Sequence, residues 1–178
     1  MPTTTHPCPS PNAPATTDPA LQQRFRDVMA GVATPVAVIT AMADQVPHGT
    51  TVSAFASLSM TPPMVAVCLD RGSELLAMIR TTGCFGVNVL GTGHADLALT
   101  FARKGGAAKF DHVEWTADHG LPRLPGATWL ACRVSRFVDG GDHVIVLGDV
   151  HAADAQEADP LTYYRRLFGT HTAFTELA

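Results

Sequence analysis

The densest group of hydroxyl side chains in this sequence lies in the segment Gly49–Pro63. Hydroxyl side chains recur there at every second position, first at Thr51 and Ser53 and, after a short break, at Ser57 and Ser59. This spacing would place hydroxyl and backbone N–H groups along one edge of the chain, a surface that suits an uncharged polar ring edge and a phosphate. The same pattern is also typical of a solvated edge strand followed by a loop.

A second group is basic. Arg103, Lys104 and Lys109 fall within seven residues and follow an apolar segment with helical spacing. Guanidinium and ammonium groups bind phosphate through charge-assisted hydrogen bonds. Read alone, the run also fits an exposed charged loop.

Two further segments combine aromatic, imidazole or cationic groups with turn residues. Gly140 and Gly141 allow a tight turn before His143 and leave room for a planar ligand above it, although a histidine at a hairpin tip also fits a plain surface position. Near the end of the chain, Pro160–Arg166 carries two tyrosines and two arginines, which predict a short C-terminal helix over Pro160–Phe168, capped by Asp159.

Several common signatures are absent from the sequence. Gly91–His94 has no third glycine for a dinucleotide fingerprint, Lys104–Gly106 lacks the P-loop order, and no G-x-S-x-G elbow occurs. The eight histidines form no H-x-H or H-E-x-x-H motif, and the four cysteines form no C-x-x-C pair. We therefore predict no metal site, and we expect the cysteines within apolar stretches to be small core residues.

Composition narrows the class of protein. The chain has 178 residues, 46% of them apolar and 16% charged, and a formal net charge of −4. This balance predicts one globular domain and disfavours nucleic acid as a partner. No apolar run reaches the roughly 18–20 residues that cross a bilayer, and Met1–Pro14 has no apolar segment typical of a secretory signal. We expect a cytoplasmic protein without membrane contact.

The elements that must position these groups follow from local patterns. Residues 1–18 hold five of the 13 prolines and predict a disordered tail, which leaves 19–178 as the folded domain. Asp18 and Pro19 are a good N-cap and first residue for an amphipathic helix that ends near Gly31. Two more helices are predicted, over Ser73–Arg80 and Ala95–Ala102.

The rest of the pattern is rich in strands. The predicted strands are Val36–Thr40, Val46–Ala54, Met64–Leu69, Phe85–Leu90, Glu114–Thr116, Thr128–Val138 and His143–Ala152. The last two are separated by a strong hairpin turn over 139–142. Strands at short spacing with few helices predict a mainly β (α+β) fold, an antiparallel barrel with peripheral helices.

Taken together and in this order, the motifs resemble the flavin reductase family of the FMN-binding split-barrel type, the reductase components of two-component flavin-dependent monooxygenases. The resemblance spans about four-fifths of the chain. The matching stretches are P-H-G-x-T-x-S-x-F-x-S-x-S-x-x-P-P at 47–63, V-C-L-D at 67–70, F-x-V-N-V-L at 85–90, F-A-R-K…K-F at 101–110 and G-D-H-x-I-x-x-G-x-V at 141–150.

The resemblance implies a homodimer of antiparallel split β-barrels with flavin near the subunit interface. It implies that His143 lies where the nicotinamide stacks. It also implies flavin contacts from Thr50, Thr51, Val52, Ser53, Ser57, Leu58, Ser59, Cys68, Leu69, Asp70, Asn88, Phe101, Arg103, Lys109, Phe110 and Tyr164.

The function implied is an NAD(P)H:flavin oxidoreductase that reduces FMN or FAD, with NADH or NADPH as co-substrate. Such a protein supplies reduced flavin by diffusion to a separate monooxygenase. The cofactors carry this chemistry themselves, which explains why no catalytic triad is visible. A flavoprotein with tightly bound flavin, a non-catalytic flavin- or haem-binding module and a structural β-barrel dimer are the alternatives. The sequence does not choose between the two flavins or the two nicotinamides.

Overall fold

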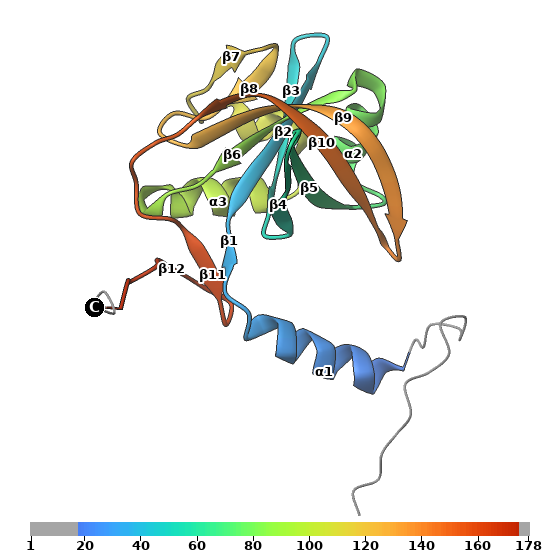
Figure 1. The fold of residues 1–178 in the computed structure, drawn as a ribbon, viewed down its shortest axis with the longest axis vertical. Coiled ribbons are helices and arrows are strands. Elements are labelled where there is room, and N and C mark those ends of the chain that lie inside the picture. Colours follow the sequence, from blue (N-terminus) through green and yellow to red (C-terminus); the bar gives the residue numbers. More distant parts are fainter. Residues whose placement is uncertain (1–17, 175–178) are drawn as a thin grey trace, which may run out of the picture.

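The computed structural model describes residues 18–174 (Figure 1). The disordered tail predicted for residues 1–18 lies outside this part, apart from Asp18. The described chain is mainly β, with antiparallel strands and a few helices, as predicted.

One seven-stranded antiparallel sheet forms the body of the molecule, in the order β3-β2-β6-β9-β10-β5-β4. Alternation of buried and exposed side chains along β5 shows that one face of the sheet packs inward. Six of the seven predicted strands are confirmed in the main sheet with small changes at their ends. Their bounds are β2 Ala37–Ala43, β3 Val46–Val52, β5 Pro63–Asp70, β6 Cys84–Val89, β9 Thr128–Gly140 and β10 His143–Asp154. Strand β4 (Phe55–Met60) was not predicted as a separate strand.

Two helices cover the sheet, and local sequence explains where each begins and ends. Helix α2 (Glu74–Thr82) starts at Ser73, whose Oγ accepts a hydrogen bond from the Leu76 N–H at 3.4 Å, and it ends at Gly83 in the left-handed conformation. Helix α3 (Ala95–Ala102) has the predicted bounds and follows a 3₁₀ turn η1 (Thr92–His94). A second 3₁₀ turn, η2 (Gly106–Phe110), carries Lys109 back toward β3.

The main core lies between α2 and the inner face of the sheet. Leu75, Leu76 and Ile79 of α2 are buried there against strand residues such as Phe85 and Val146. A smaller cluster joins α3 and η2 to the sheet through Phe101 and Phe110. These two clusters fix α2 and η2 on either side of β3.

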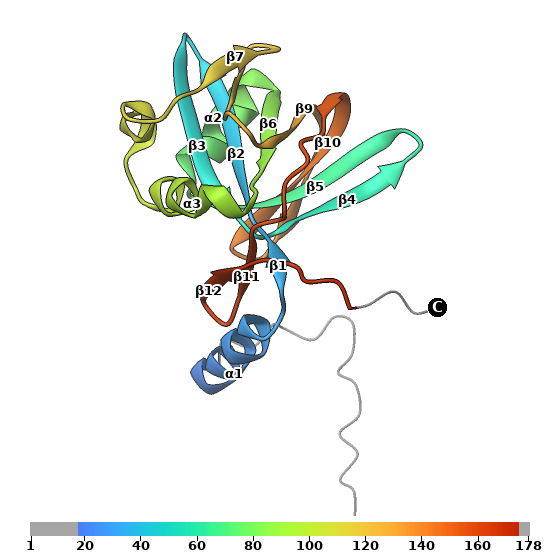
Figure 2. The same ribbon diagram turned by 90° about the vertical axis from the view of Figure 1, so that its left-hand side faces the viewer.

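The two edge strands of the sheet, β3 and β4, are consecutive in the sequence. Strand β3 pairs only with β2, β4 pairs only with β5, and residues 53–54 connect them. Figure 2 shows the β2–β3 and β4–β5 hairpins diverging from this corner. Each edge strand therefore has unpaired backbone N–H and C=O groups on one side.

The C-terminal helix predicted over Pro160–Phe168 is wrong, because this segment forms the hairpin β11 (Thr162–Tyr164) and β12 (Leu167–Gly169). Leu161 donates its N–H to the Leu90 carbonyl at 2.9 Å and accepts from the Val36 N–H at 3.1 Å. These bonds between distant segments hold the chain extended. Strand β11 then pairs with β1 (Thr34–Pro35), which a local helix could not do.

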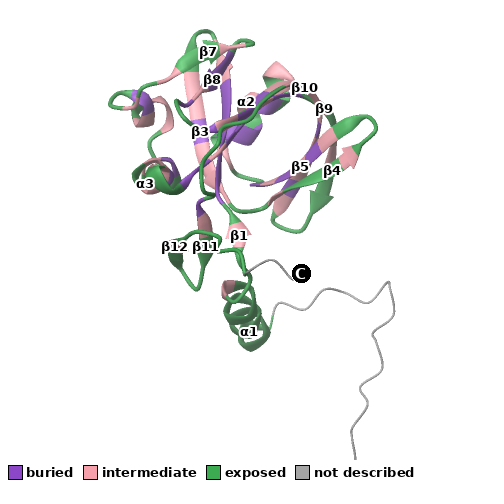
Figure 3. Cartoon of the chain, turned by 60° about the vertical axis from the view of Figure 1, so that its left-hand side comes forward, coloured by how far each residue is buried: buried purple, intermediate pink, exposed green. Residues whose placement is uncertain are grey.

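Helix α1 (Pro19–Ala30) begins at the predicted cap, where the Asp18 carboxylate accepts from the Ala20 N–H at 2.9 Å. No residue of this helix is buried, and Phe25 and Val28 are 62% and 68% exposed. Figure 3 shows α1 exposed along its length, beside the small sheet β1-β11-β12.

The remaining strands, β7 (Thr116–Asp118) and β8 (Leu121–Arg123), form a separate hairpin. The strand predicted at Glu114–Thr116 overlaps β7 only at Thr116. Pro122 of this hairpin accepts a hydrogen bond from the Thr40 hydroxyl at 2.7 Å, which ties the hairpin to the main sheet.

Candidate functional site

A groove of about 290 Å³ lies at the corner where β3 ends and β4 begins. It is lined by side chains and backbone from β3, β5 and the first residue of β10. Seven predicted flavin contacts meet here with His143, the residue predicted to lie beside the nicotinamide. The seven, from segments far apart in the sequence, are Thr50, Thr51, Val52, Ser53, Cys68, Leu69 and Asp70.

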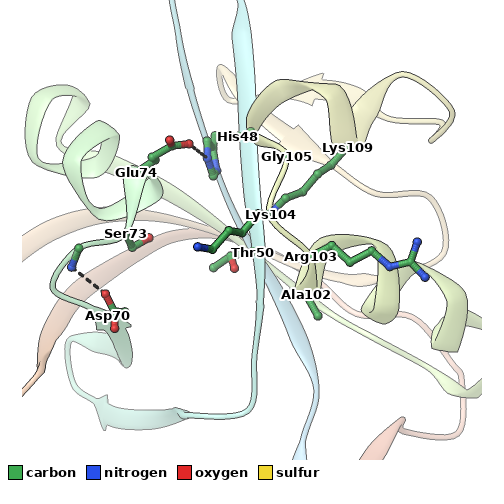
Figure 4. Close-up of a pocket in the computed structure, with 12 residues that line it drawn as sticks. His48, Thr50, Asp70, Ser73, Glu74, Ala102, Arg103, Lys104, Gly105 and Lys109 are labelled. Carbon is green, nitrogen blue, oxygen red and sulfur yellow. Dashed lines mark hydrogen bonds and ion pairs between the residues drawn. The ribbon is translucent and has the colours of Figure 1, made fainter.

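The groove continues into a larger cavity of about 800 Å³, with Thr50, Asp70 and Ser73 common to both. The α2 N-terminus forms one wall of the cavity, and the segment between α3 and η2 forms the other (Figure 4). The cavity is lined by His48, Thr50, Asp70, Gly72, Ser73, Glu74, Ala102, Arg103, Lys104, Gly105, Gly106 and Lys109.

Lys109 is held in place by the edge of β3. Its ammonium donates to the carbonyls of Gly49 at 2.9 Å and Phe101 at 3.2 Å. Burial lowers the pKa of Lys109 from its ordinary value, and the charge of Glu74 acts in the opposite direction. Lys109 thus brings a fixed, half-buried positive charge to the cavity wall.

Lys104 and Arg103 are neighbours that extend in different directions. In the view of Figure 4, Lys104 extends toward the side formed by Asp70 and Ser73, whereas the Arg103 guanidinium extends to the opposite side. Within residues 18–174, the Lys104 ammonium has no hydrogen-bond or ion-pair partner. Lys104 belongs to the predicted basic run but was not among the implied flavin contacts. It is better placed than Arg103 for an anion in the cavity.

An imidazole–carboxylate pair closes another side of the cavity. His48 Nε2 lies 3.3 Å from Glu74 Oε2, and the His48 side chain is 12% exposed while that of Glu74 is 80% exposed. An ionised carboxylate only accepts, so Nε2 carries the hydrogen of this bond. The other ring nitrogen, Nδ1, is buried without a hydrogen-bond partner in the described chain.

His143 stands at the open end of the groove, opposite Asp70 in the β5–β10 register. Its Nδ1 lies 2.8 Å from Asp142 Oδ1, and this hydrogen bond holds the pKa of Asp142 below its usual value. Because the carboxylate only accepts, Nδ1 is the donor. In the neutral tautomer of this half-exposed ring, Nε2 is then an acceptor.

Local hydrogen bonds fix the groove floor. The Thr51 hydroxyl donates to the Ala98 carbonyl at 2.7 Å, and Cys68 donates its N–H to the Ala54 carbonyl at 2.9 Å. The Asp70 side chain accepts from the Gly72 N–H at 2.7 Å, which forms the turn before α2. These hydrogen bonds order the chain around the groove, and none of them involves the Thr50 or Ser53 hydroxyl.

Three predicted site residues are core residues instead. Asn88 is fully buried, donates to the Val38 carbonyl and Thr40 hydroxyl, and accepts from the Leu124 N–H at 2.7 Å. Phe101 and Phe110 are also buried, with ring centroids 4.9 Å apart. Their side chains support β3 and η2 from behind, so we do not place them among the flavin contacts.

Four other predicted residues lie outside both the groove and the cavity. Ser57, Leu58 and Ser59 are on the edge strand β4, and the Ser59 hydroxyl accepts from the Thr61 N–H at 3.3 Å. Tyr164 is on β11 and is 43% exposed. The hydroxyls beyond Ala54 lie on an edge strand, and their flavin contacts stay a prediction.

Four cavity residues were not among the implied flavin contacts: His48, Ser73, Glu74 and Lys104. His48 lies inside the matching stretch at 47–63, and Lys104 belongs to the basic run that the sequence already offered for phosphate. Ser73 and Glu74 looked like an ordinary helix start, and only their position beside β3 brings them to the cavity.

Within residues 18–174, no group of three His, Cys, Asp or Glu side chains is arranged to hold a metal ion. None of the helices described is both long and apolar enough to span a membrane.

Comparison with known sequences shows the family. The profile of the flavin reductase like domain matches residues 29–172, and the chain therefore belongs to this family. The reductase component of a 4-nitrophenol 4-monooxygenase/4-nitrocatechol 2-monooxygenase from Rhodococcus opacus is 42% identical over 152 residues, which cover 85% of this chain and 82% of that protein. The NADH-dependent FMN reductase SmoA of Agrobacterium fabrum is 34% identical, covering 82% and 83%.

Solved structures agree with this assignment. The NADH:FAD oxidoreductase SgcE6 of Streptomyces globisporus C-1027, in complex with NAD and FAD fragments, superposes with a TM-score of 0.83 at 28% identity. The match covers 92% of this chain and all of that one.

Proposed function

We propose that this protein is an NAD(P)H:flavin oxidoreductase that reduces FMN or FAD and passes the reduced flavin to a separate monooxygenase. The observation that carries the proposal is the continuity of a hydroxyl-lined groove with a cavity that holds two lysines. A flavin has the same two parts, an uncharged ring with polar edges and a phosphate-bearing chain. The named relative from Rhodococcus opacus is itself a reductase component.

The groups present fit a flavin. The free edge of β3 and the hydroxyls of Thr50 and Ser53 offer donors and acceptors to the ring, and Lys104 and Lys109 offer positive charge to phosphate. The flavin supplies the hydride chemistry when bound. The chain holds the ring in a fixed plane and places N–H donors where negative charge develops on reduction.

His143 positions the nicotinamide in this proposal. Its Nδ1–H is held by Asp142, so Nε2 of the neutral tautomer can accept from the carboxamide N–H₂ of the co-substrate. This role requires no proton transfer by His143. It orients the nicotinamide against the flavin at the contact distance that hydride transfer requires.

We further propose that the fold is a split barrel that acts as a homodimer. The free edges of β3 and β4 form the split, and the exposed apolar stripe of α1 supports a contact with a second copy of the chain. The stripe consists of Leu21, Phe25, Val28 and Met29 of α1 and continues to Val32 just beyond the helix, each at least 43% exposed. We place the protein in the cytoplasm, where the nicotinamide co-substrates are reduced.

Steady-state oxidation of NADH and NADPH with excess FMN or FAD tests the proposed reaction. Many turnovers per protein support the reductase. A single stoichiometric reduction indicates a permanently bound flavin, and no reaction with retained flavin binding indicates a binding module.

The variant His143→Ala tests the positioning role. We expect a raised KM for NADH with flavin affinity unchanged, and Arg136→Ala at an exposed position on the same hairpin is the control. An unchanged rate and KM would remove His143 from the site.

A further inference from the structure

The large cavity contains more than a phosphate site. Lys104 and Lys109 occupy one side, and the His48–Glu74 pair occupies another. A volume of about 800 Å³ is at the upper end of the range for whole small-molecule sites, roughly 300–1,000 Å³. The cavity therefore has room for more than a terminal phosphate group.

Glu74 is an unusual neighbour for a phosphate monoester. The Glu74 carboxylate is close enough to Lys109 to affect its titration, and a Cβ on Gly106 would lie 3.7 Å from Glu74 Oε2. The carboxylate thus faces the same loop that carries the lysines. A dianionic monoester bound there would be repelled by this negative charge.

A dinucleotide presents different chemistry at the same place. Its pyrophosphate spreads two negative charges over two groups, and the chain continues into a ribose with two adjacent hydroxyls. A carboxylate accepts hydrogen bonds from hydroxyls, and these charge-assisted bonds are stronger than neutral ones. A 2′-phosphate on that ribose would replace a donor with a like charge.

We infer that Glu74, held by His48, accepts hydrogen bonds from the ribose hydroxyls of an adenosine diphosphate group whose phosphates lie on Lys104 and Lys109. The inference rests on the proposed function and deepens it, because it assigns a preference for ligands with a free ribose diol. The diol can come from the adenosine half of FAD or from that of NADH. If it comes from FAD, Glu74 favours FAD over FMN. If it comes from NADH, Glu74 favours NADH over NADPH.

His48 is a positioning residue in this arrangement. It lies on β3 with its ring largely buried, and its Nε2–H donates to a carboxylate that is otherwise exposed. Exposed carboxylates usually move among several rotamers, and this bond restricts Glu74 to the one that faces the cavity. Loss of the bond should weaken discrimination without removing the carboxylate.

The test measures binding rather than turnover. FAD and FMN are titrated into the full chain by flavin fluorescence, and NAD⁺ and NADP⁺ into the flavin-loaded protein by calorimetry. The variant is Glu74→Gln, which keeps size and removes charge. Glu157→Gln, the same change at an exposed position outside the cavity, is the control.

Two ratios are compared, Kd for FAD over Kd for FMN and Kd for NAD⁺ over Kd for NADP⁺. In Glu74→Gln we expect one of these ratios to rise about tenfold, because the ligand with the free ribose diol loses a charge-assisted hydrogen bond. A shift in the FAD:FMN ratio identifies the flavin as the source of the diol. A shift in the NAD⁺:NADP⁺ ratio alone identifies the nicotinamide. His48→Phe should move the same ratio in the same direction by a smaller factor, about threefold.

Two results separate this inference from the proposed function. If the unmodified chain binds neither flavin, the proposed function fails. If it binds flavin and both ratios stay unchanged in Glu74→Gln, only the role of Glu74 is overturned. Thermal melts of each variant show whether it is folded before its ratios are compared.

Discussion

Helices α1 and α2 have the same kind of sequence and opposite surroundings. Both carry apolar residues at helical spacing and both begin at a polar N-cap. Helix α2 buries Leu75, Leu76 and Ile79 against the main sheet, whereas α1 buries no residue within the described chain. An apolar stripe therefore predicts that a helix will be covered, but does not say by which surface. In α2 the cover is the chain's own sheet, and for α1 we propose a second copy.

The sharpest test of this difference places a charge on each stripe. Ile79 is fully buried, so Ile79→Glu puts an unpaired carboxylate in the core. We expect a loss of stability on the order of 4 kcal/mol or more, measured by urea unfolding. Ala77→Glu, on the exposed side of α2, should leave the midpoint nearly unchanged. A small effect of Ile79→Glu would mean that α2 does not pack as described.

The corresponding change in α1 is Phe25→Glu. Because Phe25 is 62% exposed in the single chain, we expect the fold to survive and the apparent mass in light scattering to fall from dimer to monomer. Gln23→Glu, on the opposite side of the helix, is the matched control. An unchanged mass for both variants would show that α1 is not part of a dimer contact.

The same contrast between inward and outward positions applies to the cysteines of the sheet. Burial raises the pKa of the Cys132 thiol to about 12, so it stays protonated and should not react with a thiol reagent at pH 8. Cys68 lines the groove and is only half-buried. We expect Cys68 to be labelled slowly, and its labelling should slow severalfold when flavin is added. Mass spectrometry of the labelled peptides measures the reaction of Cys68 and Cys132. If flavin does not slow the labelling of Cys68, the flavin binds elsewhere.

The smallest expected effect is at the exposed tip of the β9–β10 hairpin. His143 lowers the pKa of Asp142 through their hydrogen bond, so this pair stabilises the fold above the ordinary carboxyl pKa. The contribution is lost as the pH falls through the lowered pKa of the folded state. Asp142→Asn should therefore reduce the unfolding midpoint slightly at pH 7 and not at pH 2. Equal effects at both pH values would contradict the assignment.

Much of the fold could be predicted because the relevant signals are local. The cap at Asp18, the glycine turn before His143 and the apolar spacing of α3 each act over a few residues, and the structure confirms the elements they predict. The predicted C-terminal helix failed because the decisive hydrogen bonds of Leu161 reach Val36 and Leu90, far away in the sequence. Local propensity carries no information about such partners.

The residues predicted for the candidate site also fall into two groups. One group meets in the groove as predicted: Thr50–Ser53, Cys68–Asp70 and His143. Asn88 and Phe101 were predicted by the same reasoning and are buried in the core. A motif marks both the residues that touch a ligand and those that hold the strand behind them. Only the side-chain surroundings separate the two groups.

The sequence by itself determined a mainly β chain, the positions of α1, α2 and α3, the hairpin turn before His143, and a family whose chemistry depends on a bound flavin. The tertiary structure decided that the edges of β3 and β4 stay open, that Glu74 faces the lysines, and that α1 stays uncovered. The physical reason is the distance along the sequence over which each interaction acts. Caps, turns and periodicity act between near neighbours, whereas a cavity and an exposed surface depend on which distant segments pack together.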